Sequence, residues 1–335
     1  MPAFSLKAAA IDYGQLEDRS RRLARLGLPV TLELHTFGGR DVDSQDGRRA
    51  ALANLARLRD AFGEVAPTVH VPYQSVERVT REDFDEAQVE RSVAFAREAG
   101  AHAVVVHRYW GLVFGDAPPR STRAEATAGF NEAITRLARA AGDVRLLVEN
   151  VGHYSLLPRD GRHILSGPLD HFFPWEIAAF RAHVEAERLA NVGVFVDVAH
   201  ATLSANLFNV RRARGAPVPD RRFDWITDDD LDRTDTLHPF DFVDPAMDYL
   251  HVSDSRLLAG HEWRAPDEPL LVEATCSEGM EVGTGNLPWA ALPARLGGGA
   301  RATLVLEVEP GPGDSHVSNG AQERSLRHLA KVFEA

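Results

Sequence analysis

The chain has 335 residues, of which 44% are hydrophobic and 26% are charged, and its formal net charge is -12. This is ordinary globular composition, and the length allows one large α/β domain or two smaller ones with a sizeable core. The acidic balance argues against nucleic acid as the main partner, because a phosphate backbone is bound by clustered Lys and Arg side chains.

The number of cysteines and the N-terminal residues bear on the cellular compartment of the protein. Cys276 is the only cysteine, which excludes an intramolecular disulfide and a thiolate metal cluster. The first residues, MPAFSLKAAAIDYG, lack the basic region and long apolar run of a secretion signal, and no apolar run is long enough to span a bilayer. We therefore expect a soluble, cytoplasmic protein with no membrane partner. The sequence leaves open whether the protein forms a homo-oligomer.

Short apolar runs alternate with longer amphipathic segments along the chain. Runs of this length, rich in Val, Leu and Ile, are typical of buried strands, and the segments between them are long enough for helices. The pattern therefore predicts βα units around a parallel sheet. We expect eight strands, over residues 5–11, 30–34, 68–71, 103–107, 144–149, 192–197, 248–253 and 302–308.

Two of the intervening segments, 52–62 and 130–142, place their apolar residues on one helix face. Thr122 with Glu125 predicts a capping box that opens the second of these helices. Gly142 stands where a helix C-terminus favours a residue free to adopt positive φ. These features support the alternation of strands with helices.

Eight βα units in a chain of this length favour a single (β/α)8 TIM barrel over residues 1–335. A doubly wound sheet is disfavoured because no G-x-G-x-x-G follows the first strand. Two stretches do not fit the repeat: 203–247, with RRARGAPVPDRR and DDDLDRTD, and 255–280, with HEWRAPDEP. We expect both to be elaborated loops or lids at the catalytic face, and a partly disordered surface insertion is the alternative for the first.

Polar side chains stand at or near the C-terminal ends of six predicted strands. In a barrel these ends meet at one mouth, although the residues are far apart in the sequence. A single His or Glu at such a place is more often structural, but polar groups at six strand ends in succession indicate a shared site. These residues are His70, His107, Glu149, Asp197 with His200, His251 and Glu307.

The stretch VGVFVDVAH places two ionisable side chains where burial is expected, since Asp197 and His200 follow a Val-rich strand. Charged groups are costly to bury unless something compensates them. A divalent cation such as Mn, Zn, Co or Mg would supply the compensating charge, because carboxylates and imidazoles are suitable oxygen and nitrogen ligands. The alternative is a hydrogen-bonded network without metal. We expect the metal ligands to be Glu149, Asp197, His251 and Glu307.

Several motifs carry a resemblance to a known family. LLVEN, VGVFVDVAHATLSANLF, YLHVSDSR, VGTGNLPW and LVLEVEP together resemble the xylose isomerase-like TIM barrels. That superfamily includes sugar isomerases and epimerases, inosose-processing enzymes and the endonuclease IV repair enzymes. The resemblance runs in order from about the third strand to the last, so it covers most of the chain.

The resemblance implies roles for most of the strand-end residues. In the isomerases and epimerases of the family the metal is held by a Glu, an Asp, a His and a Glu on four successive strands, which match the four expected ligands. Glu149 and Glu307 would each also act as acid or base. His200, in the D-x-x-H motif, would contact substrate or a second metal. His70 and His107 match histidines that hold further metals in endonuclease IV enzymes, and otherwise they would orient substrate hydroxyl groups.

The chain departs from the endonuclease IV pattern just before the G-T-G turn at 283–285. The residues there are CSEGMEV, without the Asp-x-His pair of those enzymes, so a full three-metal phosphodiesterase site is not expected. Glu278 or Glu281 could replace a ligand, and His261 could reach the site from the preceding loop. A two-metal site therefore stays open.

Together with the predicted metal site, the resemblance implies a divalent-metal-dependent isomerase or epimerase acting on a sugar, an inosose or a related polyol or keto compound. The reaction would be proton transfer through a metal-stabilised enediolate. Arg256, in HVSDSR, would bind a terminal oxygen or phosphate of the substrate. The alternative is a metal-dependent hydrolase or lyase, resembling endonuclease IV, with one to three metals and a small-molecule substrate. A barrel that only binds a ligand is the third hypothesis.

Overall fold

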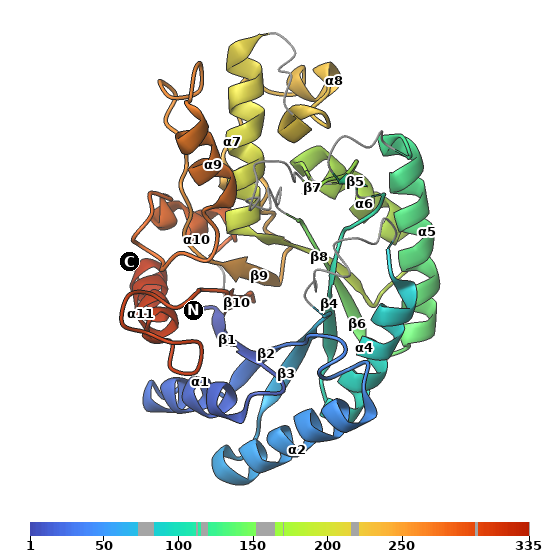
Figure 1. Ribbon diagram of the computed structural model, residues 1–335, viewed down its shortest axis with the longest axis vertical. Coiled ribbons are helices and arrows are strands. Elements are labelled where there is room, and N and C mark those ends of the chain that lie inside the picture. The colour runs from blue at the N-terminus through green and yellow to red at the C-terminus, as the bar shows by residue number, and fades with distance from the viewer. Residues whose placement is uncertain are drawn as a thin grey trace.

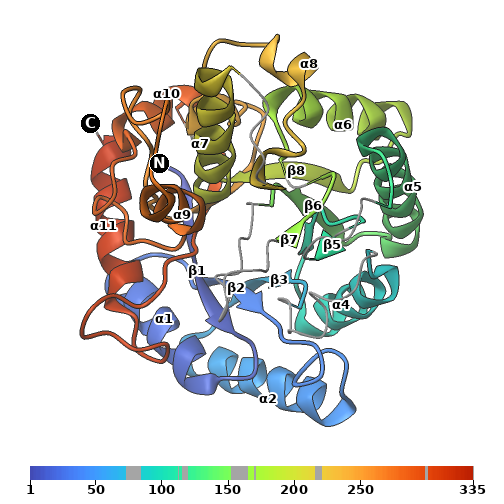
Figure 2. The same ribbon diagram turned by 45° about the horizontal axis from the view of Figure 1, so that its top comes forward.

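Parallel strands close into a barrel, and helices form a ring around it (Figure 1 and Figure 2). The computed structural model describes residues 1–72, 84–111, 113–114, 120–151, 165–169, 171–215, 221–298 and 301–334. In order around the barrel, the eight strands are β1 (Ala3–Ala9), β2 (Thr31–His35), β3 (Ala66–His70), β4 (Ala103–His107), β6 (Arg145–Glu149), β8 (Val192–Asp197), β9 (Tyr249–Val252) and β10 (Thr303–Leu306), and β10 pairs with β1. The predicted (β/α)8 barrel is confirmed.

Each of the eight predicted strands overlaps one barrel strand, and those at 103–107 and 192–197 agree in both bounds. The first strand ends at Ala9 rather than residue 11, because Asp12 is the N-cap of the next helix and accepts a hydrogen bond from Gln15 N. The last strand ends at Leu306. Glu307 therefore lies one residue past a strand end.

Helices cover the outside of the barrel, and none in the described part of the chain is both long and apolar enough to cross a bilayer. The predicted helical segments 52–62 and 130–142 fall largely within two of them, and the predicted Thr122–Glu125 capping box is present. The helices are α1 (Tyr13–Arg25), α2 (Gln45–Phe62), α4 (Glu86–Ala99), α5 (Arg123–Ala141), α6 (Pro174–Ala186), α7 (Val198–Arg214), α8 (Asp228–Leu231), α9 (Glu268–Cys276), α10 (Leu292–Arg295) and α11 (Gly320–Glu334).

Shorter elements complete the fold. Strands β5 (Val113–Phe114) and β7 (Leu165–Ser166) form a separate antiparallel pair. Single 3-10 turns lie at Arg221–Phe223, Pro239–Asp241 and Trp289–Ala291. The last helix, α11, lies beside α1 in both ribbon views, and the ion pair between Arg22 and Glu323 joins them (Figure 1 and Figure 2). The two ends of the chain therefore meet on one side of the ring.

Alternate residues of the strands fill the inside of the barrel, because successive side chains on a strand point to opposite faces. Six of them form an apolar layer: Ala103, Val105, Leu147, Phe195, Tyr249 and Val305. On five strands, the residue two positions after the last member of this layer is polar. The period of two thus brings the following residues to the C-terminal mouth: His107, Glu149, Asp197, His251 and Glu307.

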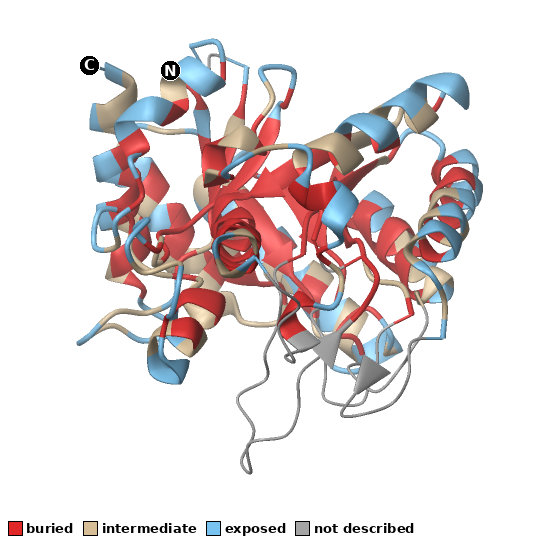
Figure 3. Cartoon of the chain, turned by 90° about the horizontal axis from the view of Figure 1, so that it is seen from above, coloured by how far each residue is buried: buried red, intermediate tan, exposed pale blue. Residues whose placement is uncertain are grey.

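A second and larger apolar cluster lies between the strands and the helices. Strand residues such as Leu32 and Leu250 belong to it together with helix residues such as Leu55 and Phe130. Figure 3 shows the strands buried and the helices buried mainly along the side that faces them. The barrel wall is therefore packed on its outer face while its inner face carries the polar mouth.

The predicted loop insertion at 203–247 includes the last part of a helix. Residues 203–214 continue α7, which starts directly after β8. The basic run RRARG suggested a loop, but Arg211, Arg212 and Arg214 form the last helical turn, where positive charge is favourable to the helix dipole. Residues 216–220 lie outside the described residues. The second predicted insertion, 255–280, is also partly helical, because it contains α9.

Asp254, two residues after β9, holds the chain segment that follows α9. Its carboxylate is buried and accepts hydrogen bonds from Gly283 N at 2.7 Å and from Trp289 Nε1 at 3.0 Å. Its backbone pairs with that of Met280. This carboxylate is therefore one anchor of residues 277–289 beside the barrel mouth, together with Ser253 Oγ, which accepts from Gly279 N, and Ser325 Oγ, which accepts from Val282 N.

Replacing Asp254 by Ala should lower the free energy of unfolding by about 3 kcal/mol, because several buried donors lose their acceptor. Urea denaturation followed by circular dichroism measures this. The matched control is Asp248→Ala, at the other end of β9, where an exposed carboxylate pairs with Arg145 at 2.9 Å. That variant should change stability by less than about 1 kcal/mol. Equal effects of the two substitutions would contradict the interpretation.

Candidate metal centre

Strand register brings the predicted site residues together at the mouth. Asp197 on β8 lies opposite His251 on β9, and His107 on β4 lies opposite Glu149 on β6. Neighbouring positions in adjacent parallel strands are about 5 Å apart. Side chains that are far apart in the sequence therefore project into the same part of the barrel.

Four of these side chains form one group, here called the quartet. Each offers a ligand atom, and the four atoms lie within 4.8 Å of one another. Nδ1 of His251 is 2.8 Å from Glu307 Oε2 and 3.1 Å from Glu149 Oε1. Asp197 Oδ2 is 3.9 Å from the same nitrogen. The quartet is Glu149, Asp197, His251 and Glu307, the four residues that the sequence predicted to lie together.

Glu149 also belongs to a second group, here called the imidazole group, with His70 and His107. His107 Nε2 lies 3.0 Å from His70 Nε2 and 3.2 Å from Glu149 Oε2. Nδ1 of His70 lies 2.8 Å from the carbonyl oxygen of Val71. A carbonyl can only accept, so Nδ1 carries the hydrogen and Nε2 of the neutral ring carries the lone pair.

The second oxygen of Glu149 favours a cation at this place. Glu149 Oε2 is buried and accepts no hydrogen bond from any residue that the structure describes. Its neighbours are the ring nitrogens of His107 at 3.2 Å and His70 at 3.5 Å. Leaving a buried carboxylate oxygen unsatisfied is costly, whereas a cation would satisfy it together with the imidazole lone pairs. The donor atoms, all oxygen or nitrogen, fit a divalent metal ion.

The charges within the quartet stabilise one another. Burial alone would raise the pKa of the Glu149 carboxyl, but the charges of His251 and His107 hold that pKa well below its usual range. Burial alone would lower the pKa of His251, but Glu33 and Glu149 raise it well above the ordinary value. A positive charge at the position of His251 is therefore strongly favoured by the carboxylates around it.

Asp197 differs from the other carboxylates of the quartet. Burial raises the pKa of its carboxyl to about 6, and the negative charges of Glu307 and Glu149 contribute in the same direction, against the attraction of His200. The protein's own positive groups do not fully compensate the carboxylates. Additional positive charge beside Asp197 would be stabilising.

Asp197 also begins helix α7. Its Oδ1 accepts a hydrogen bond from His200 N at 2.8 Å as the N-cap, which leaves Oδ2 toward the quartet. Asn150 binds the backbone of Asp197 in both directions, through Oδ1 at 2.6 Å and Nδ2 at 3.1 Å. The carbonyl of Asn150 also lies 2.9 Å from His200 Nδ1. Asn150, which follows Glu149 in the sequence, thus links the two strand ends.

His200 lies beside the quartet and contacts a carboxylate from the segment after α9. Its Nε2 is 3.0 Å from Glu278 Oε2. Of the residues that the sequence offered as replacement ligands, only Glu278 reaches this place. Glu281 pairs with Arg324 at 2.7 Å, and His261 is exposed.

A cavity of about 280 Å³ opens beside the quartet. Lys7 lies at its wall, with Nζ 3.2 Å from Glu307 Oε1 and 2.9 Å from Glu309 Oε1. The cavity is therefore polar at the metal centre and large enough for a small molecule. Its polar lining includes Lys7, His35, Asp197, His200, Glu278 and Glu307.

Arg256 does not reach the quartet. Its Nη2 is 2.6 Å from Glu262 Oε1, and its backbone N–H donates to Ser277 Oγ at 2.8 Å. It does not line the cavity beside the quartet. The chain has already turned away from the barrel at Asp254, so a position that looks close to His251 in the sequence points elsewhere.

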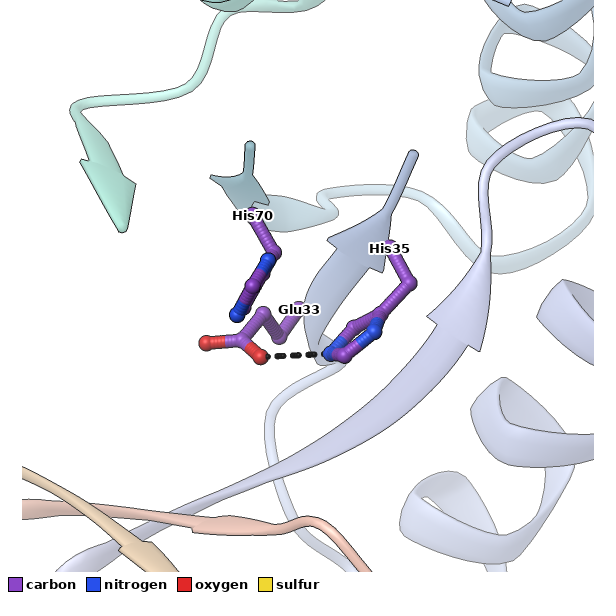
Figure 4. Close-up of side chains that lie close together, drawn as sticks. All are labelled: Glu33, His35 and His70. Carbon is purple, nitrogen blue, oxygen red and sulfur yellow. Dashed lines mark hydrogen bonds and ion pairs between the residues drawn. The ribbon is translucent and has the colours of Figure 1, made fainter. Parts of the chain in front are cut away.

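Three residues at the mouth, Lys7, Glu33 and His35, were not among the sequence candidates. Glu33 and His35 alternate along β2 and are both buried, and their side chains lie beside His70 (Figure 4). The predicted second strand ended at residue 34, one position before His35. A search for polar residues at alternate positions of this strand would have found both.

Comparisons with known proteins bear on the family and on the fold. The model of the xylose isomerase-like TIM barrel family matches residues 7–332. No curated protein matches the chain. A xylose isomerase domain protein from Alicyclobacillus acidocaldarius subsp. acidocaldarius is similar in structure, with a TM-score of 0.53, 16% identity and 100% of both chains covered.

Two further solved structures are similar over almost their whole length. The D-allulose 3-epimerase from Methylomonas sp., solved with D-allulose, has a TM-score of 0.53 and 15% identity, with 99% of this chain and 98% of that chain covered. Endonuclease IV from Thermus thermophilus has a TM-score of 0.52 and 16% identity, with 99% of each chain covered. At these identities the likeness concerns the fold.

Binding of a divalent ion to the quartet should strengthen as the pH rises. Below its pKa of about 6, Asp197 carries a proton that competes with the ion, and His251 must also release a proton before Nδ1 can donate to a metal. Calorimetric titration with Mn²⁺ should give at least about tenfold higher affinity near pH 7 than near pH 5, since the Asp197 proton alone accounts for about a factor of ten. The Asp197→Asn variant should bind Mn²⁺ more weakly, and its affinity should depend less on pH. An affinity independent of pH would contradict this view of the site.

Proposed function

Because the chain belongs to the xylose isomerase-like TIM barrel family, we propose that it is a divalent-metal-dependent isomerase or epimerase. Its substrate would be a sugar, an inosose or a related polyol or keto compound. The observation that carries the proposal is the convergence of three carboxylates and one imidazole at the barrel mouth, next to a cavity. The similarity in fold to a D-allulose 3-epimerase supports it.

The quartet would hold the cation through Glu149, Asp197 Oδ2, His251 Nδ1 and Glu307. A bound Mn²⁺, Zn²⁺, Co²⁺ or Mg²⁺ would polarise the substrate carbonyl and stabilise negative charge on the adjacent oxygen. The protein's part is to hold the ligand atoms in place and to move a proton. Burial of Glu149, Asp197 and His251 keeps competing water away from their ligand atoms.

Proton transfer at a carbon atom requires an acceptor on one side and a donor on the other. We assign these roles to Glu149 and Glu307. Glu149 ends β6 and Glu307 follows β10, and β8 and β9 lie between these strands in the barrel order. The two carboxylates thus approach the centre from different sides. One would take the proton from carbon, and the other would return one.

The first oxygen of Glu307 is held by two further groups. Lys7 Nζ lies 3.2 Å and His35 Nε2 lies 3.4 Å from Glu307 Oε1. Oε2 faces His251 Nδ1 at 2.8 Å. This arrangement restrains the rotation of the carboxylate and keeps one oxygen on the side of the quartet, as proton transfer at a fixed carbon demands.

The cavity favours an uncharged polar substrate. Beyond the quartet its wall includes two cations, Lys7 and Arg19, and two carboxylates, Glu278 and Glu309. Both cations are already paired, Lys7 with Glu309 at 2.9 Å and Arg19 with Asp18 at 2.7 Å. On the described part of this wall a phosphate ester would therefore meet carboxylates and cations that are already paired, including His200, which lies 3.0 Å from Glu278. Carboxylates, imidazoles and amides are suitable partners for hydroxyl groups.

A metal-dependent hydrolase or lyase is the second candidate, and the imidazole group is the observation that favours it. His70, His107 and Glu149 offer a further set of ligand atoms that shares Glu149 with the quartet. Two neighbouring ions bridged by a carboxylate are typical of metal-assisted cleavage of C–O or P–O bonds. The number of bound ions therefore separates the candidates.

Incubation of the Mn²⁺-loaded protein in deuterated water with a panel of ketoses and inososes should put deuterium on a carbon next to a carbonyl. Mass spectrometry and proton NMR detect it. Glu307→Gln should reduce the exchange rate at least about 100-fold, because one proton-transfer group is lost. Glu98→Gln, an exposed carboxylate paired with Arg48 at 2.7 Å, serves as control and should leave the rate unchanged. Cleavage products without exchange would favour the second candidate.

Elemental analysis after loading with Zn²⁺ and dialysis against metal-free buffer should give one tightly bound ion per chain, in the quartet, because the imidazole group offers three ligand atoms and the quartet offers four. Asp197→Ala should remove it, because a ligand of the quartet is lost. His107→Ala should keep it, because that ring belongs only to the imidazole group. Two ions in the unsubstituted chain, with one lost in His107→Ala, would favour the hydrolase or lyase.

A further inference from the structure

Glu33, His35 and His70 form a third close group at the mouth, and the proposed reaction does not use Glu33 (Figure 4). Glu33 is fully buried, and its Oε1 lies 3.0 Å from His35 Nε2. The rings of His35 and His70 stack, with centroids 4.4 Å apart. A buried carboxylate between imidazoles could hold an ion of its own or support a neighbouring site, and its contacts distinguish these two roles.

The contacts argue against a separate ion in this group. His70 has only one nitrogen free to donate a lone pair, Nε2, because the hydrogen on Nδ1 is bonded to the carbonyl of Val71. That nitrogen lies 3.0 Å from His107 Nε2 and 3.5 Å from Glu149 Oε2, which places it in the imidazole group. In this group, Glu33 and His35 are left without a third ligand.

The other oxygen of Glu33 is engaged with the quartet. Oε2 lies 2.7 Å from Nε2 of His251 and accepts a hydrogen bond from the Tyr249 hydroxyl at 2.8 Å. The opposite ring nitrogen of His251, Nδ1, is the one that faces Glu149 and Glu307. Glu33 and the quartet therefore hold the two ends of one imidazole ring.

We propose that Glu33 is a positioning residue of the metal centre. By accepting a hydrogen bond from Nε2–H, it selects the tautomer of His251 whose Nδ1 carries the lone pair, and it fixes the ring orientation. Tyr249 and His35 hold the two oxygens of Glu33 in turn. The inference rests on the proposed metal centre, but it does not depend on the substrate or on the reaction.

The charge of Glu33 contributes as well as its geometry. A carboxylate bonded to the far nitrogen makes the imidazole a stronger donor to a cation, and loss of such a partner typically costs about 10- to 100-fold in metal affinity. Without it, Nε2 of His251 would lose the buried carboxylate that accepts its hydrogen bond in the described part of the chain. Both effects weaken the metal centre without removing a ligand.

The test uses Co²⁺, whose visible spectrum reports on its ligands, with the full chain. Glu33→Ala should bind Co²⁺ about 10- to 100-fold more weakly than the unsubstituted chain, with a changed spectrum of the bound ion. Glu33→Gln keeps the size and an acceptor oxygen but not the charge, so its affinity should fall between the two. Glu98→Gln, an exposed carboxylate paired with Arg48 at 2.7 Å, is the control, and its affinity and spectrum should stay unchanged.

The outcomes separate this inference from the proposed function. If the unsubstituted chain binds no Co²⁺, the proposed metal centre itself is wrong. If it binds Co²⁺ and both Glu33 variants match its affinity and spectrum, the positioning role is wrong. If His35→Ala loses one whole ion from the metal count, Glu33 and His35 form a separate metal site, and the positioning role is again overturned.

Discussion

Mutual repulsion of carboxylates is the constraint on which the structure of the mouth depends. Glu149, Asp197 and Glu307 offer oxygens within 4.8 Å of the same imidazole nitrogen. At such distances like charges in a buried place are strongly unfavourable unless positive charge lies between them. His251 supplies part of it, and the raised pKa of Asp197 indicates that this part is not enough. The fold holds these groups together because an inward-facing side chain at the end of a strand in a closed barrel points into the mouth.

The barrel and the quartet could be predicted from the sequence because both follow from repeating patterns: the alternation of strands with helices, and the two-residue period of side chains along each strand. Strands alternate inside and outside, and a polar residue two positions after the last inward apolar residue must lie at the mouth, as Glu149 does after Leu147. The motifs that resemble the family added the order of the four ligands. Neither argument needs a distance between side chains.

Other residues escaped prediction because their positions depend on the course of the chain after the strands. Arg256 follows β9 closely, yet the turn at Asp254 directs it to Glu262. Glu278 could only be offered beside Glu281, since the contact with His200 depends on how the segment after α9 is held. Glu33 was missed for another reason: a charged residue inside a short strand looks like a solvent-facing position unless the barrel is closed.

Asp197 joins the chemistry of the mouth to the outer part of the molecule. One of its oxygens caps α7 and the other faces the quartet. Helix α7 in turn supports the chain on its way to β9, since Asn209 bonds the backbone of Leu237 in both directions. Whatever binds one oxygen of this carboxylate therefore restrains the first turn of a 17-residue helix and, through it, the segment that packs on that helix. An ion bound in the quartet would therefore be linked through this one carboxylate to the rim of the barrel.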